Sequence, residues 1–430
     1  GRQRSRVVAA TAVQCRSRVL RLLRVSGIRG RQCARALTSI QDLWQGRGIE
    51  RGRSFCTERE HRDRHKDMVQ EESTSVTSGG AGEGENTFLD LTPHELQLKL
   101  SGGLTLAAKA WGDPTKEPWM ALHGWLDNAN SFDILARELH RYLGSDLYLV
   151  CVEHAGHGLS SHREGDVYHF IDYCADACQA ADALGWEKFS LLGHSLGGSV
   201  ASVVAGAFPD RISRLVMVEA IGAFGNTPEE APAAFASAVK AEMRKPNIYP
   251  TIEAAAVRRS EANVVGTLPI DAARLLAARG VQPSTDQPGF VWRYDPALKL
   301  PSRARLTHDT VETYFRHIQC PTLVVLAEDG IFKPAKVGPW PLYTWAGRMI
   351  MSFLYPAICL LQWLPFIGKS KKLAAAVAKA RMGLSFARRF ALVHSMSWKM
   401  LPAGGHHPHM SPYLAPSIAY EIATWKKRHS

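Results

Sequence analysis

Short, solidly apolar runs alternate with amphipathic segments from residue 95 to the end of the sequence. The apolar runs show no alternation of polar and apolar positions, so both faces of each strand must be covered. This is typical of parallel strands with helices on either side. Five runs have this character: WMALHGW (119–125), LYLVCVE (147–153), FSLLGHS (189–195), LVMVEA (215–220) and TLVVLAE (322–328).

The segments outside these apolar runs predict a β-hairpin and several helices. The runs LQLKL and LTLAAKAW flank Gly102 and Gly103, as in a β-hairpin. Amphipathic helices are predicted at 131–143, 171–184 and 415–428, and a last strand is predicted at 397–401. Repeated strand, helix and strand predict an α/β fold with a mostly parallel, doubly wound sheet.

A long insertion separates the strand at 215–220 from the strand at 322–328. It starts with a capping residue, Thr227, a proline in the first turn and a capping-box partner, Glu230. A later helical pattern ends at Gly280. We therefore expect a helical cap that divides the core, with this organisation: first part of the core 87–224, cap 225–318, second part of the core 319–430.

A second insertion, about 333–392, interrupts the second part of the core. Residues 349–367 form a run of 19 without a charged side chain, which is close to the length that crosses a bilayer. Pro356 and Pro365 interrupt this run, and both of its ends must return to the same sheet, so a single crossing is not expected. Two interpretations stay open: peripheral membrane contact through about 340–367, and the interior of an enlarged cap.

The positive charge is concentrated at the start of the sequence. Residues 1–67 hold 17 Lys and Arg against 6 Asp and Glu, a net of +11, whereas the whole sequence carries +12. The remainder is nearly neutral, so nucleic-acid binding is not expected. The leader is typical of an organellar transit peptide, but the first methionine, Met68, equally allows translated upstream sequence. Residues 68–86 are predicted to form a flexible linker.

Cysteine spacing favours free thiols. Three of the eight cysteines lie in the leader, and no CxxC spacing occurs among the others, which are Cys151, Cys174, Cys178, Cys320 and Cys359. This pattern predicts a reducing compartment, with neither a disulfide framework nor a zinc site.

A five-residue motif marks the point where a strand pattern changes to a helical pattern. It reads Gly193-His194-Ser195-Leu196-Gly197. In a G-x-S-x-G turn the serine takes a strained backbone conformation, and its hydroxyl projects away from the sheet. Backbone N–H groups at the start of the following helix can stabilise an oxyanion there. Ser195 is the predicted nucleophile.

The chain from about residue 95 to 430 resembles the α/β-hydrolase fold family. The strings HGWLDNANSFD (123–133), GHGLSSH (156–162) and GHSLGG (193–198) are most similar to its serine hydrolase-like, or kraken-like, branch. The resemblance implies a core divided by a cap. It also implies an oxyanion hole formed by the backbone amides of Trp125 and Leu196, because two fixed donors stabilise a tetrahedral intermediate without reorganisation.

A catalytic serine needs a general base. The order of the triad in this family points to GGHHPHM, residues 404–410. His406 is the predicted base, and His407 and His409 are weaker candidates. Three histidines so close together also suggest a metal, but no carboxylate or cysteine framework accompanies them in the sequence, so no metal is expected. No cofactor is expected either.

The acid departs from the pattern of the family. Gly330 stands where the family commonly has Asp, and two acidic residues come just before it. Some hydrolases of this fold place the acid one strand earlier, where this sequence has Glu219. We rank Asp329 first, Glu219 second and Glu328 third. Two other acidic residues beside family-like strings are interpreted as structural: Glu153 at a strand end and Asp295 in an X-Pro turn.

These residues predict a cofactor-independent serine hydrolase that cleaves a carboxylic ester, or else a thioester or amide, through an acyl-enzyme. Serine at the nucleophile position argues against dehalogenase and epoxide hydrolase chemistry. Two alternatives stay open: a carbon–carbon bond hydrolase, and a non-catalytic ligand-binding or membrane-associated protein on the same scaffold. The expected substrate is a small apolar ester. The expected location is intracellular, in a mitochondrion or plastid if the leader is translated and otherwise in the cytoplasm.

Overall fold

The computed structural model describes residues 91–165, 168–262, 268–332, 382–383 and 385–429. All of these residues belong to one unit of the chain, Thr87–Ser430. The predicted leader, the whole predicted linker (68–86) and most of the second insertion, including 349–367, lie outside the described residues.

An eight-stranded sheet organises these residues, in the order β1-β2-β4-β3-β5-β6-β9-β10. The β1–β2 and β2–β4 pairs are antiparallel, and the other neighbouring pairs are parallel. The strands are β1 (His94–Lys99), β2 (Thr105–Trp111), β3 (Glu117–Leu122), β4 (Leu147–Val152), β5 (Phe189–His194), β6 (Ile212–Val218), β9 (Thr322–Ala327) and β10 (Met396–Leu401). The mostly parallel sheet and the hairpin at Gly102 and Gly103 were both predicted from the apolar pattern.

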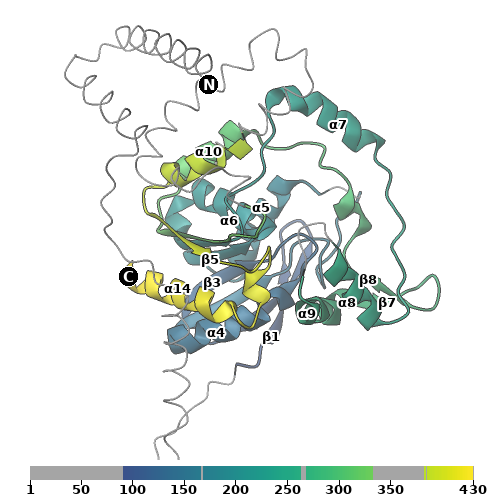
Figure 1. The fold of residues 1–430 in the computed structure, drawn as a ribbon, viewed down its shortest axis with the longest axis horizontal. Helices are drawn as coiled ribbons and strands as arrows, with labels where there is room; N and C mark the ends of the chain where they lie inside the picture. The colour runs from purple at the N-terminus through teal and green to yellow at the C-terminus, as the bar shows by residue number, and fades with distance from the viewer. Residues whose placement is uncertain (1–90, 166–167, 263–267, 333–381, 384, 430) are drawn as a thin grey trace, which may run out of the picture. The chain divides into compact units, whose positions relative to one another are not determined.

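Helices cover both faces of the sheet (Figure 1). One layer contains α4 (Asp133–Leu143) and α14 (Ala415–Arg428), and the other contains α5 (Phe170–Ala183), α6 (Leu196–Ala207) and α10 (His308–His317). Successive side chains of one strand point to opposite faces. In β4, Leu149 packs in the core on the α4–α14 side, whereas Val150 packs in the core on the α5–α6 side. This explains why the strands are apolar at every position.

The predicted cap range contains α7 (Ala231–Lys240), α8 (Ile252–Glu261), α9 (Ile270–Gly280) and a small hairpin of β7 (Val281–Pro283) and β8 (Phe290–Trp292). Small side chains such as Ala255 and Ala273 let α8 and α9 pack together in a core of their own. The capping box of Thr227 and Glu230 is present, and α9 ends at Gly280 as predicted. Helix α10 lies inside the predicted cap range but packs against α6 beside the sheet.

Short 3-10 helices connect these elements: η1 (Ala129–Phe132), η2 (Gly144–Asp146), η3 (Pro209–Arg211), η4 (Pro228–Glu230), η5 (Pro296–Lys299) and η7 (Pro408–Met410). Within the described residues, every helix is too short or too polar to cross a membrane. Four of the cysteines are described, and all four are free thiols, which agrees with the prediction: Cys151, Cys174, Cys178 and Cys320.

Candidate active site

Ser195 occupies a strained turn between β5 and α6. Its φ of 50° and ψ of −112° lie outside the conformations that non-glycine residues normally adopt, at a cost of roughly 1–3 kcal/mol. The surroundings enforce this turn. The Ser195 amide donates to the Val218 carbonyl on β6 (3.1 Å), and a Cβ on Gly197 would lie 1.9 Å from the Leu122 carbonyl oxygen. Helix α6 can therefore approach β3 closely only with glycine at 197.

His406 lies in the loop between β10 and α14, and its side chain is buried. Its Nε2 atom lies 2.8 Å from Ser195 Oγ. When Nε2 is unprotonated, it accepts a hydrogen bond from the serine hydroxyl and can take its proton. The structure thus brings together two residues that are 211 positions apart in the sequence, as general-base activation of a serine requires.

Glu219 contacts the other nitrogen of the His406 ring. It directly follows β6, is fully buried, and places Oε2 3.3 Å from His406 Nδ1. Two backbone amides fix its carboxylate: Ala327 N–H donates to Oε1 (2.6 Å) and Ile331 N–H donates to Oε2 (2.9 Å). The carboxylate is therefore held in the orientation that faces the imidazole.

Burial raises the pKa of Glu219 to about 7, although the amides of Ala327 and Ile331 act in the opposite direction. The negative charge of Asp329 adds to the increase. The carboxylate consequently changes its protonation state near neutral pH. Its ionised form is the one that stabilises an imidazolium on His406.

Glu219, which the sequence analysis ranked second, is the carboxylate that contacts His406. Asp329, ranked first, is exposed, and its Oδ1 accepts a hydrogen bond from the Gly405 amide (2.8 Å), so it braces the loop that carries His406. Glu328 is also exposed. The physical reason lies at Gly330, where a Cβ would be 2.2 Å from Glu219 Oε2. Glycine at this position leaves the space that the Glu219 carboxylate occupies.

Strained backbone conformations occur at and near the proposed triad residues. In the described part of the chain, three non-glycine residues have a positive φ: Leu126 (63°), Ser195 (50°) and Glu219 (48°). Each lies shortly after the end of a central strand: Leu126 after β3, Ser195 after β5 and Glu219 after β6. Such strain persists only where the surrounding structure over-determines it, and it is common at functional sites.

The predicted oxyanion donors lie next to Ser195. Leu196 is the first residue of α6, where N–H groups lack partners inside the helix. Among the described residues, neither the Leu196 amide nor the Trp125 amide makes a backbone hydrogen bond. A cavity of about 10 Å³ lies beside Trp125 and Ser195, and it has about the space of one water-sized sphere. Its lining consists of Gly124, Trp125, Asp127, His194, Ser195, His406 and His407.

Glu153 and Asp295 have the structural roles that the sequence suggested. Glu153 accepts hydrogen bonds from the amides of Ala129 (2.9 Å) and Leu159 (2.7 Å) at the end of β4. Asp295 caps η5 through the Ala297 amide (2.9 Å) and accepts a hydrogen bond from the Tyr168 hydroxyl (2.6 Å).

A buried polar cluster that the sequence analysis missed lies beside the candidate triad. Asp127, His194 and His407 each offer one ligand atom, and these atoms lie within 4.8 Å of one another, so they are the described residues that could hold a metal. Arg259 Nη2 lies 2.9 Å from Asp127 Oδ1 and supplies a buried positive charge. Arg259 therefore offsets part of the cost of burying the Asp127 carboxylate. His409 is buried with its ring 4.1 Å from that of His194.

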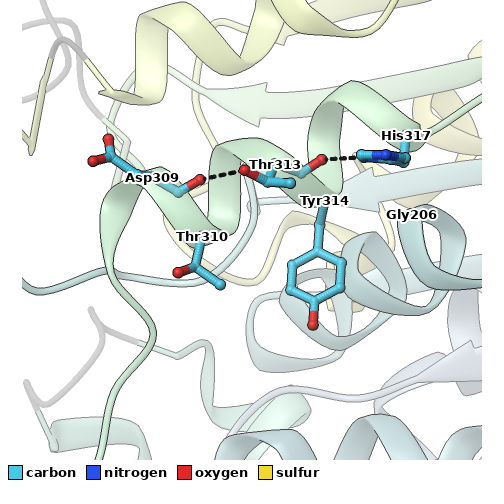
Figure 2. Close-up of a pocket in the computed structure, with 6 residues that line it drawn as sticks. All are labelled: Gly206, Asp309, Thr310, Thr313, Tyr314 and His317. Carbon is cyan, nitrogen blue, oxygen red and sulfur yellow. Dashed lines mark hydrogen bonds between the residues drawn. The ribbon is translucent and has the colours of Figure 1, made fainter.

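A larger cavity of about 540 Å³ lies at α10, away from Ser195 (Figure 2). Figure 2 shows that two of its polar side chains bond to the backbone of their own helix: Thr313 Oγ1 donates to the Asp309 carbonyl (2.8 Å), and His317 Nδ1 donates to the Thr313 carbonyl (2.8 Å). These groups do not converge on a common point. The strained serine and its partners, rather than the larger cavity, define the candidate site.

Comparisons with known proteins agree with this fold. Residues 120–279 match a family described as the alpha/beta hydrolase fold. The crystal structure of a hypothetical protein from Pseudomonas aeruginosa PAO1 has a TM-score of 0.59 and 32% sequence identity, and the match covers 78% of this chain and 99% of that one. The fold is therefore that of an α/β hydrolase.

Two relatives narrow the classification. A serine hydrolase-like protein of Dictyostelium discoideum is 31% identical over 241 residues, 54% of this chain and 66% of that protein. A serine hydrolase-like protein of Danio rerio is 31% identical over 240 residues, 53% of this chain and 70% of that protein. The matched segment thus spans about two thirds of either relative. The chain belongs to the serine hydrolase-like branch of the α/β-hydrolase superfamily, as the sequence motifs predicted.

Proposed function

We propose that this protein is a serine hydrolase that cleaves carboxylic esters through an acyl-enzyme. The observation that carries the proposal is the chain of contacts from Ser195 Oγ to His406 Nε2 (2.8 Å) and from His406 Nδ1 to Glu219 Oε2 (3.3 Å). Such a group activates a serine hydroxyl by accepting its proton and stabilising the resulting imidazolium.

The reaction follows from these positions. Ser195 Oγ attacks the ester carbonyl carbon while its proton moves to His406 Nε2, and the oxyanion accepts hydrogen bonds from the Trp125 and Leu196 amides. His406 then protonates the departing alcohol, which leaves the acyl group on Ser195. Water, deprotonated by His406, attacks this acyl-enzyme; the bond from the acyl carbon to Ser195 Oγ then breaks, His406 returns the proton to Oγ, and the acid is released. The sum is ester and water to acid and alcohol.

Aromatic side chains near Glu219 favour an apolar substrate group. Phe224 lies a short distance beyond Glu219 in the chain, is 48% exposed, and stacks on Phe332 with ring centroids 5.8 Å apart. Phe332 directly follows Ile331, whose amide bonds Glu219. An exposed ring in the segment after Glu219, stacked on the residue that follows Ile331, supports binding of an apolar acyl or alkyl group.

Rates on p-nitrophenyl esters of increasing acyl length test the proposal. We expect turnover by the full-length protein, together with labelling by a fluorophosphonate probe, and loss of both in Ser195→Ala and His406→Ala. Ser101→Ala changes an exposed serine in the β1–β2 turn and serves as the matched control with wild-type rates. Absence of hydrolysis and of labelling in folded wild-type protein would overturn the proposal and favour a ligand-binding role.

A further inference from the structure

Asp127 connects the candidate triad with the cap. We propose that it is a positioning residue, which holds the proposed base His406 in place through His194 and ties that alignment to cap helix α8 through Arg259. The inference rests on the proposed function of Ser195 and His406 and adds residues to it.

His194 joins the nucleophile to the base. It precedes Ser195 in the chain, and its Nε2 lies 2.7 Å from the His406 carbonyl oxygen. A carbonyl oxygen only accepts hydrogen bonds, so Nε2 of His194 carries the proton. This bond links the backbone of the base to the side chain next to the nucleophile. A tilt of the His194 ring therefore changes the position of His406 relative to Ser195.

Asp127 fixes the tilt of the His194 ring from the opposite side. Its Oδ2 lies 3.5 Å from His194 Nδ1 and 3.4 Å from His407 Nε2, and all three side chains are buried. Burial acts to raise the pKa of the Asp127 carboxyl. His407, His194 and Arg259 act more strongly in the opposite direction, so this pKa lies well below its usual value. The Asp127 carboxylate therefore lies against two rings that neighbour His406, and the His194 ring is held between this carboxylate and the His406 carbonyl.

The cap holds Asp127 in turn. Arg259 reaches from α8, and its Nη2 lies 2.9 Å from Asp127 Oδ1. The next residues of the same loop bind α9: Asn128 Nδ2 donates to the Leu276 carbonyl (2.9 Å), and Asn130 Nδ2 donates to the Leu275 carbonyl (2.9 Å). The segment after Trp125 therefore contacts both α8 and α9. Within this segment, Asp127 is the residue that also contacts the buried histidines.

Asp127→Asn tests this role because it keeps the size of the side chain and removes its charge. We measure kcat per serine that a fluorophosphonate can label, so that unfolded protein does not count. A displacement of the base by about 1 Å predicts a fall in kcat of about 100-fold with little change in KM. Arg259→Met is expected to lower kcat in the same way, and Arg259→Lys to restore most of it.

Two further variants make the outcome decisive. Asp127→Asn leaves the Arg259 charge without its partner, and this could prevent folding. In that case the double variant Asp127→Asn with Arg259→Met, which removes both charges, is measured instead. Arg274→Met is the matched control, because Arg274 joins the same two cap helices through an exposed contact with Glu253 (2.6 Å) and does not reach the site.

A wild-type kcat per labelled serine in Asp127→Asn, or a loss no larger than in Arg274→Met, would overturn the inference. Failure of the wild-type protein to react with the probe would instead overturn the proposed function, and this inference with it.

Discussion

Replacing Glu219 by Gln tests which carboxylate serves His406. The substitution keeps the volume of the side chain and removes its charge, while Ser195 and His406 stay unchanged. An imidazolium forms on His406 in the transition state, and Glu219 Oε2 lies 3.3 Å from its Nδ1. Loss of the carboxylate charge therefore raises the barrier to reaction.

The size of the effect follows from this distance. Two unit charges 3.3 Å apart interact by about 5 kcal/mol at an effective dielectric constant of about 20. One factor of ten in rate corresponds to about 1.4 kcal/mol. We therefore expect Glu219→Gln to lower kcat by about 10³-fold to 10⁴-fold.

Asp329→Asn is the matched comparison, measured with the same p-nitrophenyl ester. Asn keeps an oxygen that can accept from the Gly405 amide, so the loop is preserved and kcat should change by less than about threefold. Because the Asp329 charge helps to raise the pKa of Glu219, the acidic limb of the pH profile should also move to lower pH.

The opposite ranking would refute this reasoning. If Asp329→Asn lost activity by several orders of magnitude while Glu219→Gln stayed within about tenfold of wild type, Asp329 would be the acid after all. Glu328→Gln is expected to behave like wild type, because that side chain is exposed.

Three more measurements follow from the structure. First, kcat/KM should rise with pH around a midpoint near 7, because burial raises the pKa of Glu219 to about 7 and only its ionised form supports His406; a flat profile from pH 5 to 9 would contradict this. Second, Gly330→Ala should lower kcat at least about tenfold, because its Cβ would lie 2.2 Å from Glu219 Oε2, whereas Gly102→Ala has open space and should not. Third, Arg279→Met leaves Glu153 buried without its 2.7 Å partner and should lower the free energy of unfolding by about 3–5 kcal/mol. Denaturant titration checks this, and Arg274→Met, which removes an exposed ion pair, is expected to leave the midpoint of the titration close to that of the wild type.

Local sequence was sufficient for the strands of the large sheet, for several of the helices and for the proposed nucleophile. Strands such as β4 are apolar on both faces because helices cover both faces, and this is visible within a few residues. The turn at Ser195 is encoded in five consecutive residues, whose glycines permit the approach of α6 to β3. His406 could be predicted because the order of the triad and the last strand and helix locate its loop.

The acid and the Asp127 cluster depend on tertiary contacts that no local pattern contains. Glu219 and Asp329 follow neighbouring strands β6 and β9, so both are plausible from sequence. Only the amides of Ala327 and Ile331 and the space at Gly330 select Glu219. The sequence nevertheless contained an indication of Glu219. Gly330 stands where the family commonly has Asp, and Glu219 follows the preceding strand.

Trapping the acyl-enzyme tests the central claim most directly. Full-length protein is mixed with a slowly hydrolysed ester, quenched in acid, digested and analysed by peptide mass spectrometry. We predict that the acyl mass is found on Ser195, and that Ser195→Ala forms no adduct and does not turn over. An adduct on a different residue, or hydrolysis by Ser195→Ala at the wild-type rate, would contradict the account.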